Sequence, residues 1–424
     1  MAFKILKIVL KVALILISLL IFAFYLNFLL KPFCLKMGYT LCAAIGEDFF
    51  ALYQATYNFF HNHFIYGDLA KMYLVSPYFV IFKYFPASPL LIGWPFLIFT
   101  NTALSAYQFY LIFVILVYIF AFYPIYLIAK KFRVNNITKI LLFFIWFTYF
   151  PLLSDLRMGQ FNLISSLVFL FSLLGIVFYK PLSSGLLWVI SLAYKPLALL
   201  NVFYYLKTKN KVAIISFVVV FVVFTGGYLL YHQIYYPQAI NDFLKLLLLK
   251  ENRIGWQVHY PDNFSVYSFL GELFFDQSVK LFNIITKLYA LFLIGLFLFI
   301  TYKIKFLNDI KAHLYYSLYA FSTLLMYHKE VWESWLTSWL IIIIVLFILA
   351  SSRKEKLLIF LNSLILGTPS LFYYYELTKN NFWRFLLITE KALPQILIYS
   401  YLVLVMVNIL KQQKQIKEIQ SLNI

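Results

Sequence analysis

Apolar runs long enough to cross about 30 Å of hydrocarbon recur from one end of this chain to the other. Length and hydropathy predict about ten membrane helices, at residues 5–30, 104–129, 138–154, 160–179, 212–231, 282–302, 312–328, 335–350, 357–375 and 386–410. Two more apolar stretches, 77–99 and 181–206, are interrupted by prolines or by Lys195-Pro196, so each predicts either one crossing or a bent, re-entrant pair. The predicted fold is an all-α polytopic membrane protein with about 10–13 transmembrane helices.

The distribution of charge favours the re-entrant interpretation of both interrupted stretches. Lysine and arginine gather in short linkers at 130–133, 207–211, 303–311 and 353–356 and in the tail from Lys411. The positive-inside rule places such linkers in the cytoplasm. With both stretches re-entrant, every basic linker and both termini are cytoplasmic, whereas two single crossings would move linker 130–133 to the outside.

The composition agrees with an integral, multi-pass membrane protein. Of 424 residues, 64% are hydrophobic and 12% are charged, and the mean hydropathy of +0.86 excludes a soluble globular protein. The net charge of +19 resides mainly in the linkers, where it can also contact anionic lipid, so nucleic acid is not an expected partner. Residues 5–30 are an apolar run preceded by a basic residue, Lys4, as in a signal peptide. The run is too long for a signal peptide, so we expect a helix that is retained in the mature protein.

The chain is expected to form one membrane domain over residues 1–424, without a separate soluble domain. Two sizeable loops, about 31–76 and 232–281, lie on the predicted outer face. The first loop contains Cys34 and Cys42. An extracytoplasmic location permits a disulfide between them, and two unpaired thiols are the alternative.

Two adjacent carboxylates, Glu47 and Asp48, follow the first membrane helix in the first outer loop. A charge near the bilayer is costly and usually marks a site of chemistry or transport. The alternation of apolar and polar residues from Asp48 to His63 predicts an amphipathic helix in the outer interface, which would hold Asp48 at the boundary of water and lipid. Alternatively, both acids only cap this helix, because acids are favoured at helix N-termini.

Candidate phosphate-binding side chains follow the helix predicted at 138–154. The guanidinium of Arg157 has several N–H donors in one plane, which suits the binding of phosphate. Gln160 and Asn162 add neutral hydrogen-bonding groups at the start of a helix, which itself favours anions. A lone interfacial arginine can instead extend to lipid headgroups. Lys195 interrupts an apolar stretch, where an ammonium costs roughly 2.5–3.5 kcal/mol unless it is paired or hydrated. A bound phosphate would offset this cost, and a position at the outer tip of a re-entrant turn is the alternative.

Two further candidates lie in predicted outer segments. His328 could donate to a phosphate or move a proton, or it is simply a solvated loop residue. Asn263 and Ser265 fit a glycosylation sequon in the second loop, where an acceptor-binding segment is also expected. The sequence has no Cys/His cluster with zinc spacing, no Walker-type loop and no dinucleotide fingerprint, so nucleotide-sugar chemistry in its usual soluble form is unsupported.

A series of short motifs occurs in one order between residues 48 and 339. The motif positions are Asp48-Phe49 with Tyr53 and Ala55, Tyr84 with Pro86, Pro89-Leu90-Leu91 and Pro95, Gly159-Gln160-Phe161-Asn162, Ser184-Gly185-Leu186-Leu187 with Lys195-Pro196, Asn263 with Ser265, and His328 with Trp332 and Trp335. Together they resemble membrane glycosyltransferases of the C-type fold, and within these glycosyltransferase family 87, which contains mannosyltransferases that use a polyprenyl-phosphate sugar. Asn62 departs from the pattern, because the family often has glycine there, and the His/Trp turn is loosely matched.

The resemblance implies an inverting transferase that moves a hexose, expected to be mannose, from polyprenyl or dolichyl phosphate to a glycolipid or glycan at the extracytoplasmic face. It implies Asp48 as the general base, with Glu47 as a second carboxylate beside it. The side chains expected to bind the donor phosphate and sugar are Arg157, Gln160, Asn162, Lys195 and His328, and the acceptor-side candidates are Tyr53 and Asn263. No cofactor is expected, and a divalent ion at Glu47, Asp48 and Asp68 is the less favoured alternative.

Two other functions compete with this prediction. A transporter or flippase of lipid-linked sugars predicts repeated halves with Gly/Pro-interrupted helices in matching positions, but the chain has only 13 glycines and no visible repeat. A C-type transferase of another lipid-linked sugar, such as a pentose or glucose, would use the same fold and the same Asp48. Transport without a new glycosidic bond would favour the first alternative, and screening of donors separates the second.

Overall fold

The computed structural model describes residues 2–30, 45–66, 72–77, 82–247, 263–274, 278–306, 309–370 and 380–422. Within these ranges the chain forms helices joined by turns and no strand, which confirms the predicted all-helical fold. The predictions for Cys34, Cys42 and Asp68 fall outside the described residues.

The helices differ widely in length, because prolines, glycines and polar residues interrupt several of the apolar runs. Their bounds are α1 (Ala2–Leu30), α3 (Glu47–Phe60), η3 (Pro89–Gly93), α4 (Trp94–Ile98), α5 (Ala103–Phe120), α6 (Phe122–Lys131), α7 (Asn136–Thr148), α8 (Pro151–Met158), α9 (Asn162–Val177), α10 (Pro181–Tyr194), η4 (Pro196–Asn201), α11 (Val202–Lys207), α12 (Lys211–Phe217), η5 (Val218–Phe224), α13 (Thr225–Tyr235), α14 (Ala239–Leu247), α16 (Val266–Phe274), α17 (Val279–Lys303), α18 (Ile310–Tyr327), η6 (Glu333–Leu336), α19 (Thr337–Leu349), α20 (Arg353–Gly367) and α22 (Asn381–Leu422).

Several of these helices fit a multi-pass membrane protein. Five stretches of the described chain are long and apolar enough to cross a membrane, namely Ala103–Lys131, Asn136–Met158, Lys211–Tyr235, Val279–Lys303 and Asn381–Gln415. Other predicted crossings are shorter apolar helices of 10–17 residues. The run predicted at 335–350, for example, corresponds to the continuous helix Glu333–Leu349, which begins with the 3-10 turn η6 and continues as α19.

The interrupted stretch 181–206 forms a hairpin whose two arms return to the same end of the bundle. α10 is the first arm, and η4 with α11 is the second. Lys195 between them is extended, with φ −160° and ψ 134°, as expected for a residue that precedes a proline. At the open end, the Asn210 side chain donates to the Pro181 carbonyl at 3.0 Å. Of the two predicted alternatives, the structure has the bent pair.

The interrupted stretch 77–99, described from residue 82, stays beside α3. Its continuous helix, Pro89–Ile98, is too short to span a bilayer. The Ser88 hydroxyl donates to the Ala193 carbonyl at 2.6 Å, next to the bend of the hairpin. This segment therefore joins α3 to the bend of the hairpin.

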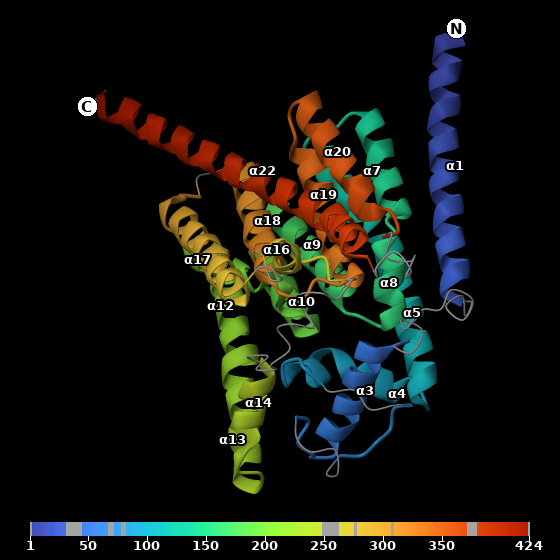
Figure 1. Cartoon of the computed structure of the whole chain (residues 1–424), viewed down its shortest axis with the longest axis vertical. Coiled ribbons are helices and arrows are strands. Elements are labelled where there is room, and N and C mark those ends of the chain that lie inside the picture. Colours follow the sequence, from blue (N-terminus) through green and yellow to red (C-terminus); the bar gives the residue numbers. More distant parts are fainter. Residues whose placement is uncertain are drawn as a thin grey trace.

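Basic linkers meet at the end of the bundle opposite to α3. Lys207 Nζ donates to the Ile304 carbonyl at 2.7 Å, and the Lys305 N–H donates to the Gln413 side chain at 3.1 Å. In Figure 1 this end is at the top: helix α1 begins and α22 ends toward it, whereas α3 and α4 lie at the bottom. The hairpin runs between the two ends, with its arms opening among the basic linkers and its bend facing α3.

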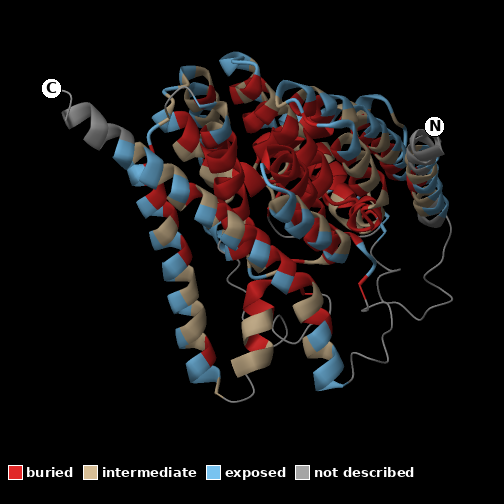
Figure 2. Ribbon diagram, turned by 90° about the horizontal axis from the view of Figure 1, so that it is seen from above, coloured by how far each residue is buried: buried red, intermediate tan, exposed pale blue. Residues whose placement is uncertain are grey.

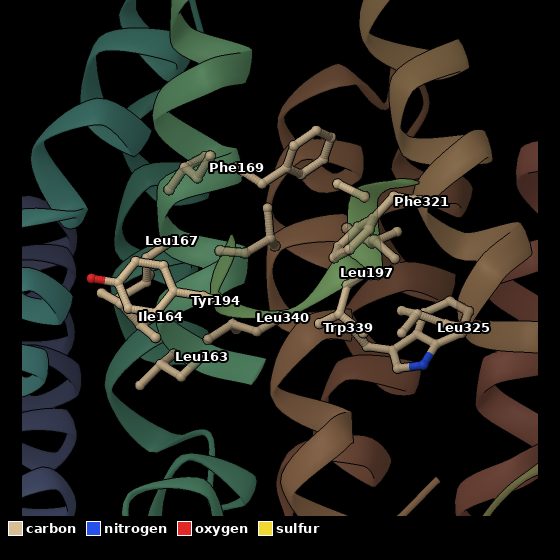
Figure 3. Packing of buried hydrophobic residues seen from close by; sticks show 14 of the residues in the cluster. Leu163, Ile164, Leu167, Phe169, Tyr194, Leu197, Phe321, Leu325, Trp339 and Leu340 are labelled. Carbon is tan, nitrogen blue, oxygen red and sulfur yellow. The ribbon is translucent and has the colours of Figure 1, made fainter. Parts of the chain in front are cut away.

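Most residues of α9, α18 and α19 are buried. Buried residues gather in the middle of the bundle (Figure 2). Figure 3 shows Tyr194 and Leu197, the neighbours of the bend at Lys195, among core residues of these helices such as Ile164 and Phe321. Packing on both sides therefore fixes the bend of the hairpin.

Small residues and hydroxyls hold the hairpin against its neighbours. Ser172 of α9 donates to the Ser184 carbonyl of α10 at 2.8 Å. A Cβ added to Gly175 would lie 2.8 Å from the Ser184 backbone nitrogen, so α9 and α10 approach as closely as glycine allows. Small residues that admit close backbone contact, with hydroxyl hydrogen bonds, are the usual basis of helix association in membranes.

This contact predicts a specific loss of stability. Gly175→Val should destabilise the protein by about 1–3 kcal/mol, because an overpacked site must displace backbone. The matched control is Gly295→Val in α17, where an added Cβ meets nothing within 4 Å. Thermal unfolding of both variants in detergent measures the difference, and equal midpoints would contradict the packing described for α9 and α10.

Candidate active site

The start of α3 is held by a contact between two glycines in the left-handed region. Gly46 has φ 73° and Gly159 has φ 63°. A Cβ added to Gly159 would lie 3.0 Å from the Gly46 Cα and 2.8 Å from the Phe49 Cβ. The Gly46 N–H also donates to the Arg157 carbonyl at 2.9 Å. These contacts join the helix that begins with Glu47 and Asp48 to the turn between α8 and α9.

Asp48 is half-buried and has a side-chain partner. The Tyr84 hydroxyl donates to Asp48 Oδ2 at 2.8 Å. The Tyr84 ring packs edge-on against Phe161, with centroids 5.4 Å apart, and so has a fixed position. Asp48 therefore has an oriented side-chain contact in addition to its place at the start of α3. Tyr84 is one of the motif positions, but the sequence did not indicate that it contacts Asp48.

The helix predicted after Asp48 exists, but it is more buried than a helix lying in an interface. Its residues from Phe49 to Thr56 are all buried. An added Cβ at Gly93 would overlap the Thr56 side chain, which shows how closely η3 covers α3. Asp48 is therefore placed by packing within the protein.

Glu47 provides a second carboxyl group beside Asp48. Partial burial raises the pKa of Glu47, and the neighbouring Asp48 charge raises it further, whereas Lys83 lowers it. Glu47 therefore takes up a proton more readily than an ordinary glutamate, which relieves the repulsion between the two adjacent carboxylates.

Lys195 lies at the bend of the hairpin with only 7% of its surface exposed. Its Nζ donates to Gln160 Oε1 at 3.0 Å and lies 4.0 Å from the centroid of the Trp335 ring. Burial lowers the pKa of Lys195, while the charges of Asp48 and Asp155 oppose that shift. The lysine predicted to bind phosphate and the aspartate predicted to act as base therefore interact electrostatically.

Asn162 and Gln160 belong to a buried network that ends at Lys195. Asn162 Nδ2 donates to Asp155 Oδ1 at 2.9 Å, and the Leu163 N–H donates to Asp155 Oδ2 at 3.1 Å. Asn162 also approaches Gln160 Oε1 at 3.4 Å. Asn162 thus supports Gln160, and Gln160 in turn contacts the lysine. Asp155, which anchors the network, was not among the predicted site residues.

Arg157 ends α8 beside the glycine contact and is half-buried. Its carbonyl accepts from the Tyr107 hydroxyl at 2.9 Å as well as from Gly46. The backbone at Arg157 therefore helps to fix the start of α3, in addition to any role of its guanidinium.

His328 follows α18 and packs against Trp335, with ring centroids 4.0 Å apart. Its Nδ1 lies 3.0 Å from the Glu330 carbonyl oxygen and 3.4 Å from the Glu330 backbone nitrogen. Burial lowers the pKa of His328 to about 4, and the nearby Lys195 charge also lowers it. His328 is therefore neutral at neutral pH and does not add a second full charge beside the lysine.

The two acceptor-side candidates are buried. Tyr53 lies on α3 next to Phe49, with ring centroids 6.3 Å apart. Asn263 donates to the Lys329 carbonyl at 3.0 Å and accepts from the Val331 N–H at 3.0 Å. Asn263 thus fastens the loop that follows His328, and its amide is turned inward instead of being presented as a glycosylation acceptor. Direct contact of either residue with a substrate stays a prediction.

A metal site also stays a prediction. In the part of the chain that the structure describes, no three His, Cys, Asp or Glu side chains are grouped as metal ligands. The alternative set of Glu47, Asp48 and Asp68 includes one residue outside that part.

Comparison with known protein families identifies the chain. The profile of glycosyltransferase family 87 matches residues 82–327, which are 246 of the 424 residues. The chain belongs to glycosyltransferase family 87. It is therefore a glycosyltransferase with an all-helical membrane fold. No curated protein and no solved structure matches it.

The family 87 match covers most of the site but begins after α3. Tyr84, Gln160 and Lys195 lie inside the matched range, and Asp48 lies before it. Asp48 is tied to the matched range through the Tyr84 hydroxyl and through the contact of Gly46 with Gly159. The structure thus connects the candidate base to the family domain.

Asn62, which stands where the family 87 pattern often has glycine, has φ 59° in the turn after α3. Asparagine tolerates the left-handed region better than other residues with a side chain. The departure therefore keeps the backbone conformation that a glycine would favour.

The contact of the two glycines predicts a coupled loss of stability and activity. Gly159→Ala should destabilise the protein by about 1–3 kcal/mol, because alanine is strained at positive φ and its Cβ would press on Gly46. It should also lower glycosyl transfer at least tenfold, because the start of α3 must move. Gly226→Ala, in open space on α13, is the control. Thermal unfolding and transfer by purified protein measure both effects, and full activity of Gly159→Ala would contradict this role.

Proposed function

We propose that this protein is an inverting glycosyltransferase that moves a hexose, expected to be mannose, from polyprenyl or dolichyl phosphate to a glycolipid or glycan acceptor. The observation that carries the proposal is that a half-buried aspartate, Asp48, held by Tyr84, and a buried lysine, Lys195, held by Gln160 and Trp335, are near enough for their charges to interact. Transfer from a sugar phosphate needs a proton acceptor for the incoming hydroxyl and a positive group for the departing phosphate. These two residues supply both in one place.

Asp48 acts as the general base in this proposal. The acceptor oxygen attacks the anomeric carbon from the face opposite the phosphate and gives its proton to Asp48, while the electron pair of the broken carbon–oxygen bond goes to the phosphate. Tyr84 donates to Oδ2 of this carboxylate, which leaves Oδ1 for the acceptor hydroxyl. A positioned base of this kind contributes roughly 10²–10⁴-fold to a rate.

Lys195 binds the donor phosphate and stabilises the charge that it gains as it leaves. An ammonium has three N–H groups, so Lys195 can contact a phosphate while one N–H stays on Gln160. The Trp335 ring covers one side of the ammonium and limits its movement. Arg157 at the end of α8 is the second cation proposed for the donor, and the neutral His328 adds a hydrogen-bonding ring.

The location of the site agrees with an extracytoplasmic reaction. The basic linkers gather at the opposite end of the bundle, which the positive-inside rule assigns to the cytoplasm together with both termini. A lipid-linked donor would then lie with its chain among the helices and its phosphate near the bend of the hairpin. The chemistry requires no cofactor, and a divalent ion at the carboxylates remains the less favoured alternative.

Membership of a transferase family argues against a transporter or flippase. A transferase of another lipid-linked sugar would use the same groups, so the choice of mannose rests on the resemblance to family 87 members.

Asp48→Asn should abolish most transfer and leave the fold intact. The amide oxygen of asparagine can still accept from Tyr84, but it cannot take a proton, so a drop of at least 100-fold is expected. Glu47→Gln is the control for loss of a neighbouring carboxylate and should retain most of the activity. Membranes given labelled polyprenyl-phosphate mannose and endogenous acceptors measure the transfer. Activity of Asp48→Asn within threefold of the unmodified protein would remove Asp48 from the mechanism.

The lowered pKa of Lys195 predicts how activity depends on pH. Burial favours the neutral amine, so Lys195 loses its charge at a lower pH than an ordinary lysine, and kcat/KM for the donor should fall as the pH rises through that lowered pKa. Arginine stays charged throughout this range. Lys195→Arg should therefore move the alkaline fall to higher pH, even if its maximum is lower.

Lys207→Arg is the control for this profile, since Lys207 lies among the basic linkers. It should leave the alkaline limb unchanged. If kcat/KM falls at the same alkaline pH in Lys195→Arg as in the unmodified protein, the charge of Lys195 does not govern use of the donor.

A further inference from the structure

A cavity of about 560 Å³ opens among the basic linkers, at the end of the hairpin far from Lys195. Lys180, Lys209 and Lys211 line it together with His313, and none of its described lining residues is a carboxylate. Its volume is in the range of ordinary small-ligand pockets. A concave surface lined by one sign of charge attracts a ligand of the opposite sign.

The fold adds backbone charge of the same sign. α10 begins at this cavity at Pro181 without a side-chain cap, whereas the Asp309 carboxylate caps α18 and the Asn210 side chain caps the helix that starts at Lys211. The N-terminal end of a helix carries a partial positive charge and favours anions. The three lysine side chains and the N-terminus of α10 thus combine to favour one anionic ligand.

The surroundings of the cavity suit a lipid better than a free anion. Val212 and Ile176 line it beside the lysines. On the helix that leaves the cavity from Lys211, Ile215 is 61% exposed and Val219 is 52% exposed, which provides an apolar surface for acyl chains. A charged pocket that continues into an exposed apolar helix face matches a headgroup joined to hydrocarbon.

We propose that this cavity binds the phosphate headgroup of an anionic phospholipid. Lys180, Lys209 and Lys211 contact the phosphate, and the acyl chains lie along the helix that begins at Lys211. The bound lipid bridges the two arms of the hairpin, because Lys180 precedes α10 and Lys209 follows α11. The proposal stands apart from the transfer site and does not depend on which sugar is moved.

The test uses the full-length protein in a neutral detergent and follows thermal unfolding and lipid binding by native mass spectrometry. Phosphatidylglycerol should bind and raise the unfolding midpoint, whereas phosphatidylcholine and inorganic phosphate should do neither. Each lysine near an anionic lipid contributes about fivefold in affinity, so a triple variant should bind phosphatidylglycerol at least tenfold more weakly. Binding should also weaken as the salt concentration rises.

The triple variant is Lys180→Gln, Lys209→Asn and Lys211→Gln, with asparagine at Lys209 because that residue has φ 54°. The control is Lys130→Gln, Lys131→Gln and Lys354→Gln, which removes three exposed lysines of other basic linkers.

A second variant, Val212→Trp, fills the cavity without a change of charge and should also reduce lipid binding. Equal losses in the triple variant and its control would overturn the proposal. Equal binding of phosphatidylcholine, or displacement of the lipid by inorganic phosphate at equal concentration, would also overturn it.

Discussion

A lysine held inside an apolar bundle is the constraint on which the rest of this structure depends. An ammonium that is buried in the protein without partners is costly, because it loses its hydration. Lys195 avoids that cost through the Gln160 amide, the Trp335 ring and the charges of Asp48 and Asp155. These partners come from three parts of the chain, namely the start of α3, the segment 155–160 and η6, so satisfying one cation brings the elements of the site together.

The glycine contact between α3 and the turn after α8 has the complementary role. It brings the start of α3 against the family domain so closely that neither glycine can carry a side chain without movement. The position of Asp48 at the start of α3 is thereby tied to the turn between α8 and α9. Asp48 and Lys195 thus lie toward one end of the bundle, and the basic linkers lie at the other.

Much of the fold could be predicted from the sequence, because apolar runs and proline positions are local signals. The helices and the bend at Lys195-Pro196 are examples. The contacts of Tyr84 with Asp48 and of Trp335 with Lys195 could not be predicted, because these partners are distant in sequence. Asp155 and Asn162 are only seven residues apart, but their contact depends on the left-handed turn at Gly159 between them. Burial also could not be predicted from the sequence. The amide of Asn263 is turned inward and His328 is neutral, whereas the sequence suggested an accessible asparagine and a phosphate-binding histidine.

The most direct measurement is a cryo-electron-microscopy structure of the protein with a non-hydrolysable polyprenyl-phosphate sugar bound. The account predicts the phosphate within hydrogen-bond distance of Lys195 Nζ and the Asp48 carboxylate on the opposite face of the sugar ring. A phosphate bound among the basic linkers instead, with the sugar beyond reach of Asp48, would contradict it.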